Sequence, residues 1–200
     1  MKLYTRNKQV ILASSSQTRI SYLKKHFRKA IAVQHKVNEM EIKSKNKDLS
    51  FEDLVKLLAK RKAQSIMEDY QEGIVIGSDQ LLVCNGKLFN KSKNISEARS
   101  NLIKLSGKKH RLISSTYAMK NQKPYFEETK EAEVLFKNVS QIRIEEYLTE
   151  KKKEVLRSVG SYRIEDNKKY NFLKILEGDY ETIIGFPIIN LKNKLMEDTK

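Results

Sequence analysis

Two apolar runs in the first half of the sequence each lead into side chains suited to chemistry. Residues 73–80 read GIVIGSDQ, so a run that predicts a buried strand ends at the carboxylate of Asp79. Residues 10–13 read VILA and are followed by the hydroxyls of Ser14 and Ser16 and by the cation of Arg19. Ligands in open α/β sheets bind at the carboxyl ends of strands. Hydroxyls beside a fixed positive charge therefore indicate a phosphate site.

Helices are expected to position these groups. Ile20, Leu23 and Phe27 have helical spacing, which places the serines at a helix N-terminus, where unpaired backbone N–H groups favour an anion. A capping signal at Ser50 predicts a second helix, extending to about residue 70. Its apolar face is expected to contain Leu54, Leu57, Leu58 and Ile66. On this helix, Lys60 and Lys62 point in different directions.

The remaining residues alternate between strand and helix signals. The strand that carries Asp79 is expected to continue through Val83 and to turn at Asn85 and Gly86. The other predicted elements are a helix from 96 to 105, strands at 111–119 and 125–136, a helix from 140 to 148, a strand near 161–164, a hairpin across 172–184 and a helix after Pro187. This mixture predicts an α/β fold, and the absence of a linker or repeat leaves residues 1–200 as one domain.

Composition and length narrow the class of protein. The chain has 200 residues, 39% of them hydrophobic, which is enough for a core. It has no stretch near the roughly 20 apolar residues of a membrane span and no secretory signal, so we expect a cytoplasmic protein without a membrane partner. The single cysteine, Cys84, lies in an apolar run and is expected to be a small buried residue rather than a catalytic thiol.

The net charge of +15 raises the question of nucleic-acid binding. The basic residues are mostly lysines, are spread along the chain and are interleaved with acidic residues, as in residues 130–133 and 151–154. This distribution favours a solvated basic surface over a specific nucleic-acid site.

Taken in order, the motifs resemble those of the Maf family, the septum-formation-inhibitor-like nucleotide pyrophosphatases. The resemblance extends from residue 11 to about 195 and rests on LASSSQTR at 12–19, VNE at 37–39, LAKRKA at 58–63, IGSDQ at 76–80, NK at 90–91, EAR at 97–99, LSG at 105–107, VGSY at 159–162, EGDY at 177–180 and IGFP at 184–187. It implies an elongated mixed β-sheet with flanking helices and a cleft between two lobes, similar to the inosine-triphosphatase-like house-cleaning enzymes.

The resemblance also implies an activity and a set of site residues. Family members hydrolyse nucleoside triphosphates between the α and β phosphates, giving a monophosphate and pyrophosphate, with a divalent cation such as Mg²⁺ or Mn²⁺. Carried over by position, the catalytic residues are Asp79, Lys62 and Lys91, the substrate-binding residues are Ser14, Ser16, Arg19 and Glu165, and the metal-binding residues are Glu39 and Asp79. Cations would neutralise the triphosphate, and the carboxylates would bind metal or orient water.

Several of these residues also have a structural explanation, and Ser14 to Ser16 could be an ordinary N-cap, a role compatible with phosphate binding. Asp79 could cap a turn after its strand, and Lys62 and Lys91 could be ordinary solvated lysines. The metal carboxylate could be Glu41 instead of Glu39, although the resemblance favours Glu39. The three histidines, His26, His35 and His110, have no metal-ligand spacing and are expected to be structural or surface residues.

Three segments depart from the usual family pattern. Residues 17–19 read QTR where members commonly have Pro-Arg-Arg, a change that removes one cation and could lower turnover. Residues 90–92 read NKS where many have Gly-Lys-Pro, which keeps Lys91 but loses the proline that would restrict the backbone after it. Residues 163–166 read RIED where many have Gly-Ile-Gln-Gly. Glu165 and the GSDQ segment together resemble the branch that acts on 7-methyl-GTP, since a carboxylate favours a cationic methylated base.

Other functions stay open at this point. A nucleotide-binding regulator of cell division or septum formation would bind nucleotide with little turnover. A nucleic-acid-binding protein would show steeply salt-dependent binding regardless of Asp79. The resemblance allows a homodimer, although no feature of the sequence requires one.

Overall fold

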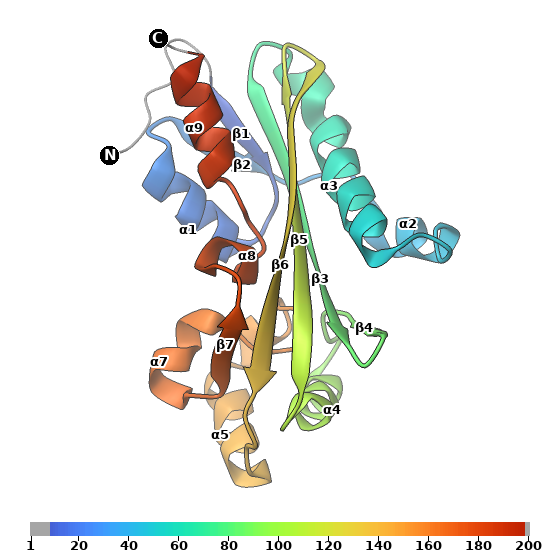
Figure 1. Cartoon of the computed structure of the whole chain (residues 1–200), viewed down its shortest axis with the longest axis vertical. Coiled ribbons are helices and arrows are strands. Elements are labelled where there is room, and N and C mark those ends of the chain that lie inside the picture. The colour runs from blue at the N-terminus through green and yellow to red at the C-terminus, as the bar shows by residue number, and fades with distance from the viewer. Residues whose placement is uncertain (1–8, 199–200) are drawn as a thin grey trace. The chain divides into compact units, whose positions relative to one another are not determined.

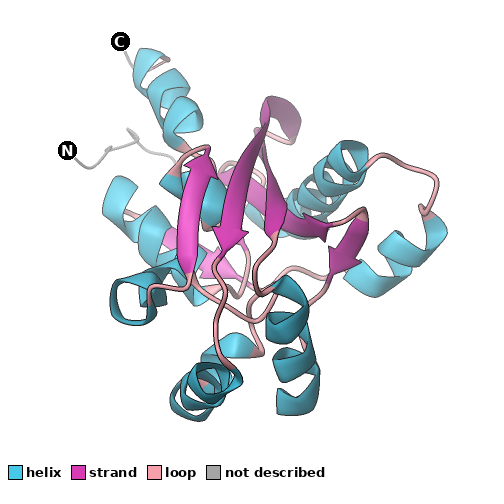
Figure 2. Ribbon diagram, turned by 60° about the horizontal axis from the view of Figure 1, so that its bottom comes forward, coloured by secondary structure: helices cyan, strands magenta, loops and turns pink. Residues whose placement is uncertain are grey.

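The computed structural model describes residues 9–198, which form a mixed β-sheet with flanking helices (Figures 1 and 2). The strands are β1 (Val10–Ala13), β2 (Ala30–Val33), β3 (Ile74–Cys84), β4 (Lys87–Phe89), β5 (Lys109–Lys120), β6 (Lys123–Phe136) and β7 (Leu173–Glu177). The α-helices are α1 (Gln17–His26), α2 (Glu39–Lys45), α3 (Phe51–Met67), α4 (Ile95–Leu105), α5 (Gln141–Glu150), α6 (Lys152–Val155), α7 (Asn167–Tyr170), α8 (Tyr180–Ile183) and α9 (Ile189–Glu197). Two 3₁₀ helices are η1 (Glu68–Tyr70) and η2 (Ile164–Asp166). The predicted α/β class is confirmed.

The sheet contains both parallel and antiparallel pairs. Its strand order is β2-β1-β3-β5-β6-β7, and β4 pairs with β3. Strand β1 is parallel to both β2 and β3, whereas β3 is antiparallel to β4, and β6 is antiparallel to β7. In the tight turn between β3 and β4, Asn85 and Gly86 adopt φ angles of 50° and 70°. These angles match the predicted hairpin.

The described chain divides into two compact units, and strands β3, β5 and β6 each contribute residues to both. Unit 1 comprises residues 9–79, 114–130 and 185–198, and unit 2 comprises residues 80–113 and 131–184. In unit 1, α3 covers one face of the strands and α1 and α9 cover the other (Figure 1). Its core is formed by residues of β1, α3, β3 and β5, namely Ile11, Ala13, Ala59, Ala63, Ile66, Met67, Val75, Tyr117 and Met119. The single two-lobed domain with a cleft stays a prediction.

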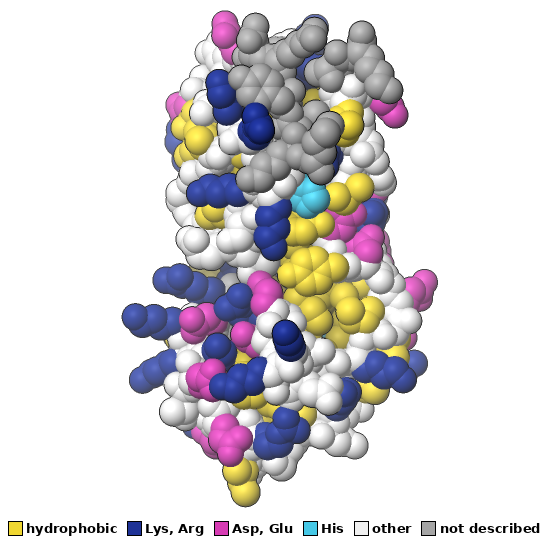
Figure 3. All heavy atoms as spheres, turned by 90° about the vertical axis from the view of Figure 1, so that its left-hand side faces the viewer, with side chains coloured by type: hydrophobic (Ala, Val, Ile, Leu, Met, Phe, Trp, Pro, Cys, Tyr) yellow, Lys and Arg dark blue, Asp and Glu magenta, His cyan; other side chains and the backbone are white. Residues whose placement is uncertain are grey.

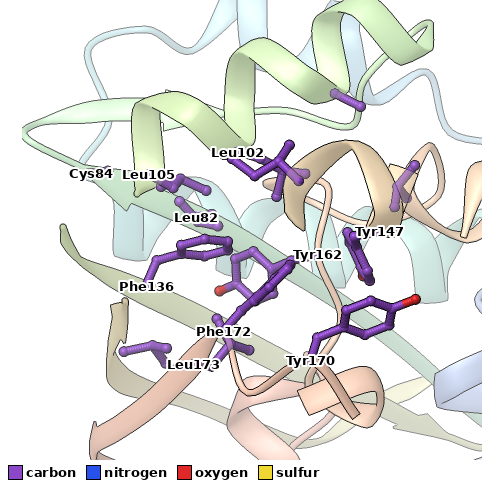
Figure 4. Packing of buried hydrophobic residues seen from close by; sticks show 14 of the residues in the cluster. Leu82, Cys84, Leu102, Leu105, Phe136, Tyr147, Tyr162, Tyr170, Phe172 and Leu173 are labelled. Carbon is purple, nitrogen blue, oxygen red and sulfur yellow. The ribbon is translucent and has the colours of Figure 1, made fainter. Parts of the chain in front are cut away.

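Aromatic side chains pack together within the core of unit 2 (Figure 4). Phe172 contacts Phe136, Tyr147 and Tyr170, with ring centroids 5.4–5.6 Å apart. Tyr162 packs edge-on against Phe136 at 5.7 Å. Cys84 belongs to the same core and is 4% exposed, and burial raises the pKa of its thiol. The prediction that this cysteine is a small buried residue is confirmed.

Two predicted strands in the last third of the chain are wrong. No strand forms at 161–164, because Gly160 and Ser161 adopt φ angles of 70° and 64°, a left-handed conformation that interrupts an extended chain. The hairpin across 172–184 does not form either, because β7 pairs with β6 instead of a following strand. The side chain of Asp179 accepts a hydrogen bond from Thr182 N at 2.8 Å and caps α8. The helix after Pro187 is confirmed as α9.

Candidate active site

The first strand of unit 1 leads directly into the helix that carries Arg19. Ser16 is the N-cap of α1 and accepts a hydrogen bond from Arg19 N at 3.5 Å, while Ser16 N donates to Ser14 Oγ at 3.1 Å. Both serines therefore stabilise the turn between β1 and α1. The expectation that they lie at a helix N-terminus is confirmed. Their role in binding phosphate stays a prediction.

A close approach between α3 and β3 determines where Lys62 and Asp79 meet. A Cβ atom on Gly77 would lie 2.1 Å from the backbone oxygen of Ala59 and 2.6 Å from the backbone nitrogen of Ala63. Only glycine allows the strand to pass this close to the helix. Lys62 lies on the helix face that also buries Leu58 and Ile66, whereas Lys60 is exposed. The two lysines point in different directions, as predicted.

Lys62 connects two carboxylates. Its Nζ lies 2.8 Å from Asp79 Oδ1 and 2.7 Å from Glu39 Oε1. The side chains of Lys62 and Asp79 are 4% and 7% exposed, and that of Glu39 is 25% exposed. Glu39 is the first residue of α2, a helix capped by Asn38, rather than a loop residue. Its neighbour Glu41 instead pairs with Lys45 on the surface.

The guanidinium of Arg19 binds the backbone next to Asp79. Its Nη1 donates a hydrogen bond to Ser78 O at 2.6 Å, and the residue is 9% exposed. Burial lowers the pKa of Arg19, and the charges of Asp79 and Glu39 act in the opposite direction. Because arginine stays protonated in proteins, the cluster combines two cations with two carboxylates. Its formal charges are therefore balanced before any ligand binds.

The backbone beside Asp79 is fixed by a buried hydroxyl. Ser78 Oγ lies 2.8 Å from Ser115 O and 2.9 Å from Gly185 O, and it is fully buried. Thr116 Oγ1 donates a hydrogen bond to Ser78 Oγ at 3.4 Å. This arrangement limits movement of the strand on which Asp79 is presented.

One buried carboxylate oxygen of the cluster lacks a hydrogen-bond partner among the described residues. Asp79 Oδ2 is buried and has no hydrogen-bond partner among the described residues. A buried carboxylate oxygen without a partner is costly unless a cation or water satisfies it. Within residues 9–198, no group of three or more His, Cys, Asp or Glu side chains could hold a metal ion. Two carboxylates still suit Mg²⁺, which usually keeps several waters and binds substrate phosphates.

The other two predicted site residues belong to unit 2. Lys91 is exposed and forms an isolated antiparallel bridge with Val159. The next residue, Ser92, is buried, and its Oγ lies 2.6 Å from Ser161 Oγ, so the segment carrying Lys91 is anchored by its neighbour. Glu165 lies in η2, and its Oε1 accepts from Arg163 Nη2 at 3.1 Å. The cluster described above consists of unit 1 residues alone.

Sequence reasoning missed one residue of the cluster. His35 Nε2 lies 3.4 Å from Glu39 Oε1, and the His35 side chain is 11% exposed. The histidine lies four residues before Glu39, but it precedes α2 instead of sharing the helix. The only sequence signal was its proximity to the VNE segment.

The mixture of basic and acidic side chains on the surface is relevant to whether the protein binds nucleic acid. On the face shown in Figure 3, Lys and Arg side chains are interspersed with Asp and Glu. Ion pairs such as Lys36 with Asp69 and Lys120 with Asp198 occur on the surface of the described chain.

No helix within residues 9–198 is long and apolar enough to cross a membrane.

Comparisons with known proteins agree with the motifs. Residues 9–198 match the family described as Maf-like protein. A 7-methyl-GTP pyrophosphatase of Bartonella henselae is 37% identical over 186 residues, covering 93% of each chain. A nucleoside triphosphate pyrophosphatase of Legionella pneumophila subsp. pneumophila is 34% identical over 196 residues, covering 98% of this chain and 96% of the other. A solved nucleoside-triphosphatase / dITP/XTP pyrophosphatase from Mycobacterium abscessus has a TM-score of 0.37 at 13% identity, covering 62% of this chain and 70% of that one. The family match and the two sequence relatives show that the chain belongs to the Maf family.

Proposed function

We propose that the protein hydrolyses nucleoside triphosphates between the α and β phosphates, releasing a nucleoside monophosphate and pyrophosphate. The observation that carries the proposal is the contact of Lys62 with both Glu39 and Asp79, in a chain whose relatives include pyrophosphatases. Hydrolysis at the α-phosphorus needs positive charge on the phosphates and a carboxylate that accepts a proton from water. We propose that Lys62 and Arg19 supply the first and Asp79 the second.

Asp79 is the proposed general base. Its Oδ1 is held by Lys62, and its Oδ2 has no partner among the described residues, so one oxygen is oriented while the other can accept a proton. Lys62 is proposed to stabilise negative charge on the phosphates. Lys91 would neutralise phosphate charge, and Arg19, Ser14 and Ser16 would bind phosphate.

We further propose that Glu39 and Asp79 hold a divalent cation, Mg²⁺ or Mn²⁺. Bound there, the cation would neutralise phosphate charge and polarise a phosphoryl oxygen. The support is the pair of carboxylates, Glu39 and Asp79, that lie together on the Lys62 ammonium. Hard cations of this kind prefer carboxylate oxygens.

The proposed substrate is 7-methyl-GTP. Relatives named 7-methyl-GTP pyrophosphatase include the one from Bartonella henselae, and Glu165 supplies a carboxylate that could accept from the guanine edge and attract a cationic methylated base. Gln80 of the GSDQ segment has a different role in unit 2, because its Nε2 donates to the carbonyls of Thr182 and Ile183 at 2.9 Å. The support from sequence for this substrate therefore rests on Glu165.

The test is pyrophosphate release from 7-methyl-GTP, GTP, UTP and dTTP with Mg²⁺ or Mn²⁺. We expect the highest kcat/KM for 7-methyl-GTP and reduced preference for it in Glu165→Gln. Release of pyrophosphate from another nucleotide would keep the activity and reject the substrate. Binding of nucleotide without release from any member of the panel would favour the regulator of cell division. A homodimer and a cytoplasmic location stay predictions.

A further inference from the structure

The segment before α2 brings a histidine to one of the proposed metal ligands. His35 Nε2 lies 3.4 Å from Glu39 Oε1, the same oxygen that contacts Lys62 at 2.7 Å. Both His35 and Glu39 are partly shielded, with side chains 11% and 25% exposed. The imidazole of His35 and the ammonium of Lys62 therefore approach Glu39 Oε1 from two different segments of the chain.

The other ring nitrogen of His35 determines which tautomer is present. Val37 N donates a hydrogen bond to His35 Nδ1 at 3.3 Å. A ring nitrogen that accepts a hydrogen bond carries no proton, so in this tautomer the proton lies on Nε2. The hydrogen bond from Val37 thus assigns the proton to Nε2, the ring nitrogen that lies 3.4 Å from Glu39 Oε1.

The backbone around His35 is anchored to α3. Lys36 N donates to Ser65 Oγ at 3.1 Å, and Ser65 Oγ donates to Lys62 O at 2.8 Å. On the other side, the side chain of Asn38 accepts from Glu41 N at 3.2 Å and begins α2 at Glu39. The segment from 35 to 39 is therefore tied at one end to the helix that carries Lys62 and fixed at the other by a helix cap.

We propose that His35 is a positioning residue that orients the Glu39 carboxylate for metal binding. The inference rests on the proposed function, because it assumes that Glu39 is a metal ligand. Groups that hydrogen-bond a ligating carboxylate keep it in the binding orientation, and their loss typically weakens metal affinity by about 10- to 100-fold. His35 does not contact the metal or the substrate in this role. It acts through Glu39.

Two substitutions separate this role from a structural one. In His35→Gln the side-chain amide reaches the position of Nε2, so a donor toward Glu39 is kept and the acceptor for Val37 N is lost. In His35→Asn the amide oxygen reaches the position of Nδ1, so the acceptor is kept and the donor toward Glu39 is lost. Binding of Mn²⁺ alone to the full chain is measured from the electron paramagnetic resonance signal of free Mn²⁺, and pyrophosphate release is measured in parallel.

We expect His35→Asn to bind Mn²⁺ about tenfold more weakly than the wild type, and His35→Gln to retain most of the affinity. Equal affinity in all three proteins, or equal weakening in both variants, would overturn the proposal. A wild type that binds no Mn²⁺ would also overturn it, since Glu39 would then not be a ligand. If the Mn²⁺ pattern holds but no nucleotide is cleaved, the proposed function fails while the role of His35 stands.

The tautomer can be tested without any substitution. Long-range ¹H–¹⁵N spectra of the wild type distinguish a proton on Nε2 from one on Nδ1. We expect the Nε2–H form for His35. A protonated Nδ1 would contradict the hydrogen bond from Val37 and overturn the proposed orientation.

Discussion

Lys62 Nζ lies 2.8 Å from Asp79 Oδ1 in the interior of unit 1, joining the helix α3 to the strand β3. Both side chains are almost fully buried. Removing a charge from water is expensive, and a buried ion pair is weak evidence for stability by itself. The presence of this buried ion pair beside a second carboxylate, Glu39, is better explained by chemistry at this site.

Substitutions of the two acidic residues at the start of α2 should differ sharply in their effect on the metal dependence of the reaction. Glu39 contacts the buried Lys62, whereas Glu41 pairs with the exposed Lys45. We expect Glu39→Gln to raise the Mn²⁺ concentration needed for half-maximal pyrophosphate release at least about tenfold, because a ligand oxygen loses its charge. The matched control, Glu41→Gln, should leave the metal dependence unchanged. Equal effects of the two substitutions would reject Glu39 as the ligand.

Loss of the Lys62 ammonium should destabilise the protein. In Lys62→Met the carboxylates of Glu39 and Asp79 would repel each other with the bridging cation removed, at a cost of about 3 kcal/mol. Denaturant unfolding of the wild type and of Lys62→Met at pH 8 measures this change.

The control for that experiment is Lys60→Met. Lys60 is exposed, with its Nζ 5.9 Å from the centroid of the Tyr117 ring. We expect a change in unfolding free energy of less than about 1 kcal/mol, independent of pH. A Lys62→Met protein that is as stable as Lys60→Met at pH 8 would show that the bridging contacts are not formed in solution.

Gly77 should tolerate no side chain, because β3 passes close to α3 at this position. A Cβ atom there would meet backbone atoms of α3 at 2.1 and 2.6 Å, so the helix that carries Lys62 would have to move. We expect Gly77→Ala to cost about 3 kcal/mol and to reduce kcat. Gly86→Ala is the control, because a Cβ atom there meets nothing within 4 Å and only its φ of 70° opposes the change, at about 1 kcal/mol. A Gly77→Ala protein with normal stability would contradict the packing of α3 on β3.

His110 should make stability depend on pH. Burial lowers the pKa of His110 from 6.5 to about 4, and its Nε2 lies 2.5 Å from Tyr162 Oη in the core of unit 2. Above pH 6.5 the histidine is neutral in both the folded and unfolded states. Between pH 6.5 and 4 only the unfolded state gains the proton, so this group should remove about 3 kcal/mol of stability across that window.

The variant His110→Gln isolates this contribution. Glutamine cannot be protonated in this range, so the difference in unfolding free energy between the two proteins should change with pH only between about 6.5 and 4. Parallel pH profiles for the wild type and His110→Gln would show that His110 is not buried in its neutral form.

Much of the fold could be predicted because its elements have clear periodicity. The apolar run of β3, the capping signal at Ser50 and the turn at Asn85 each correspond to the element expected. Leu57 is only partly buried, whereas Leu54, Leu58 and Ile66 are buried as predicted. Strand β2 was missed because its four residues are half-buried and give no clear alternation. The predicted Maf-family resemblance is confirmed by the family match.

The site could be predicted only in part from the sequence. Lys62 and Asp79 are 17 positions apart, and no local pattern shows that a helix and a strand will meet there. The apolar run singled out Asp79 and the family resemblance supplied Lys62, while the glycine contact and the charge balance with Arg19 required the structure. His35 was missed because its contact with Glu39 depends on an irregular segment rather than on a repeating period.

The central claim is α–β cleavage with Asp79 as the base. The most direct test is ³¹P NMR of the products formed from 7-methyl-GTP by the wild type and by Asp79→Asn, with Mn²⁺ present. We predict pyrophosphate and the monophosphate from the wild type, no orthophosphate, and a rate at least about 100-fold lower in Asp79→Asn. Orthophosphate with the diphosphate as products, or equal rates in the two proteins, would contradict it.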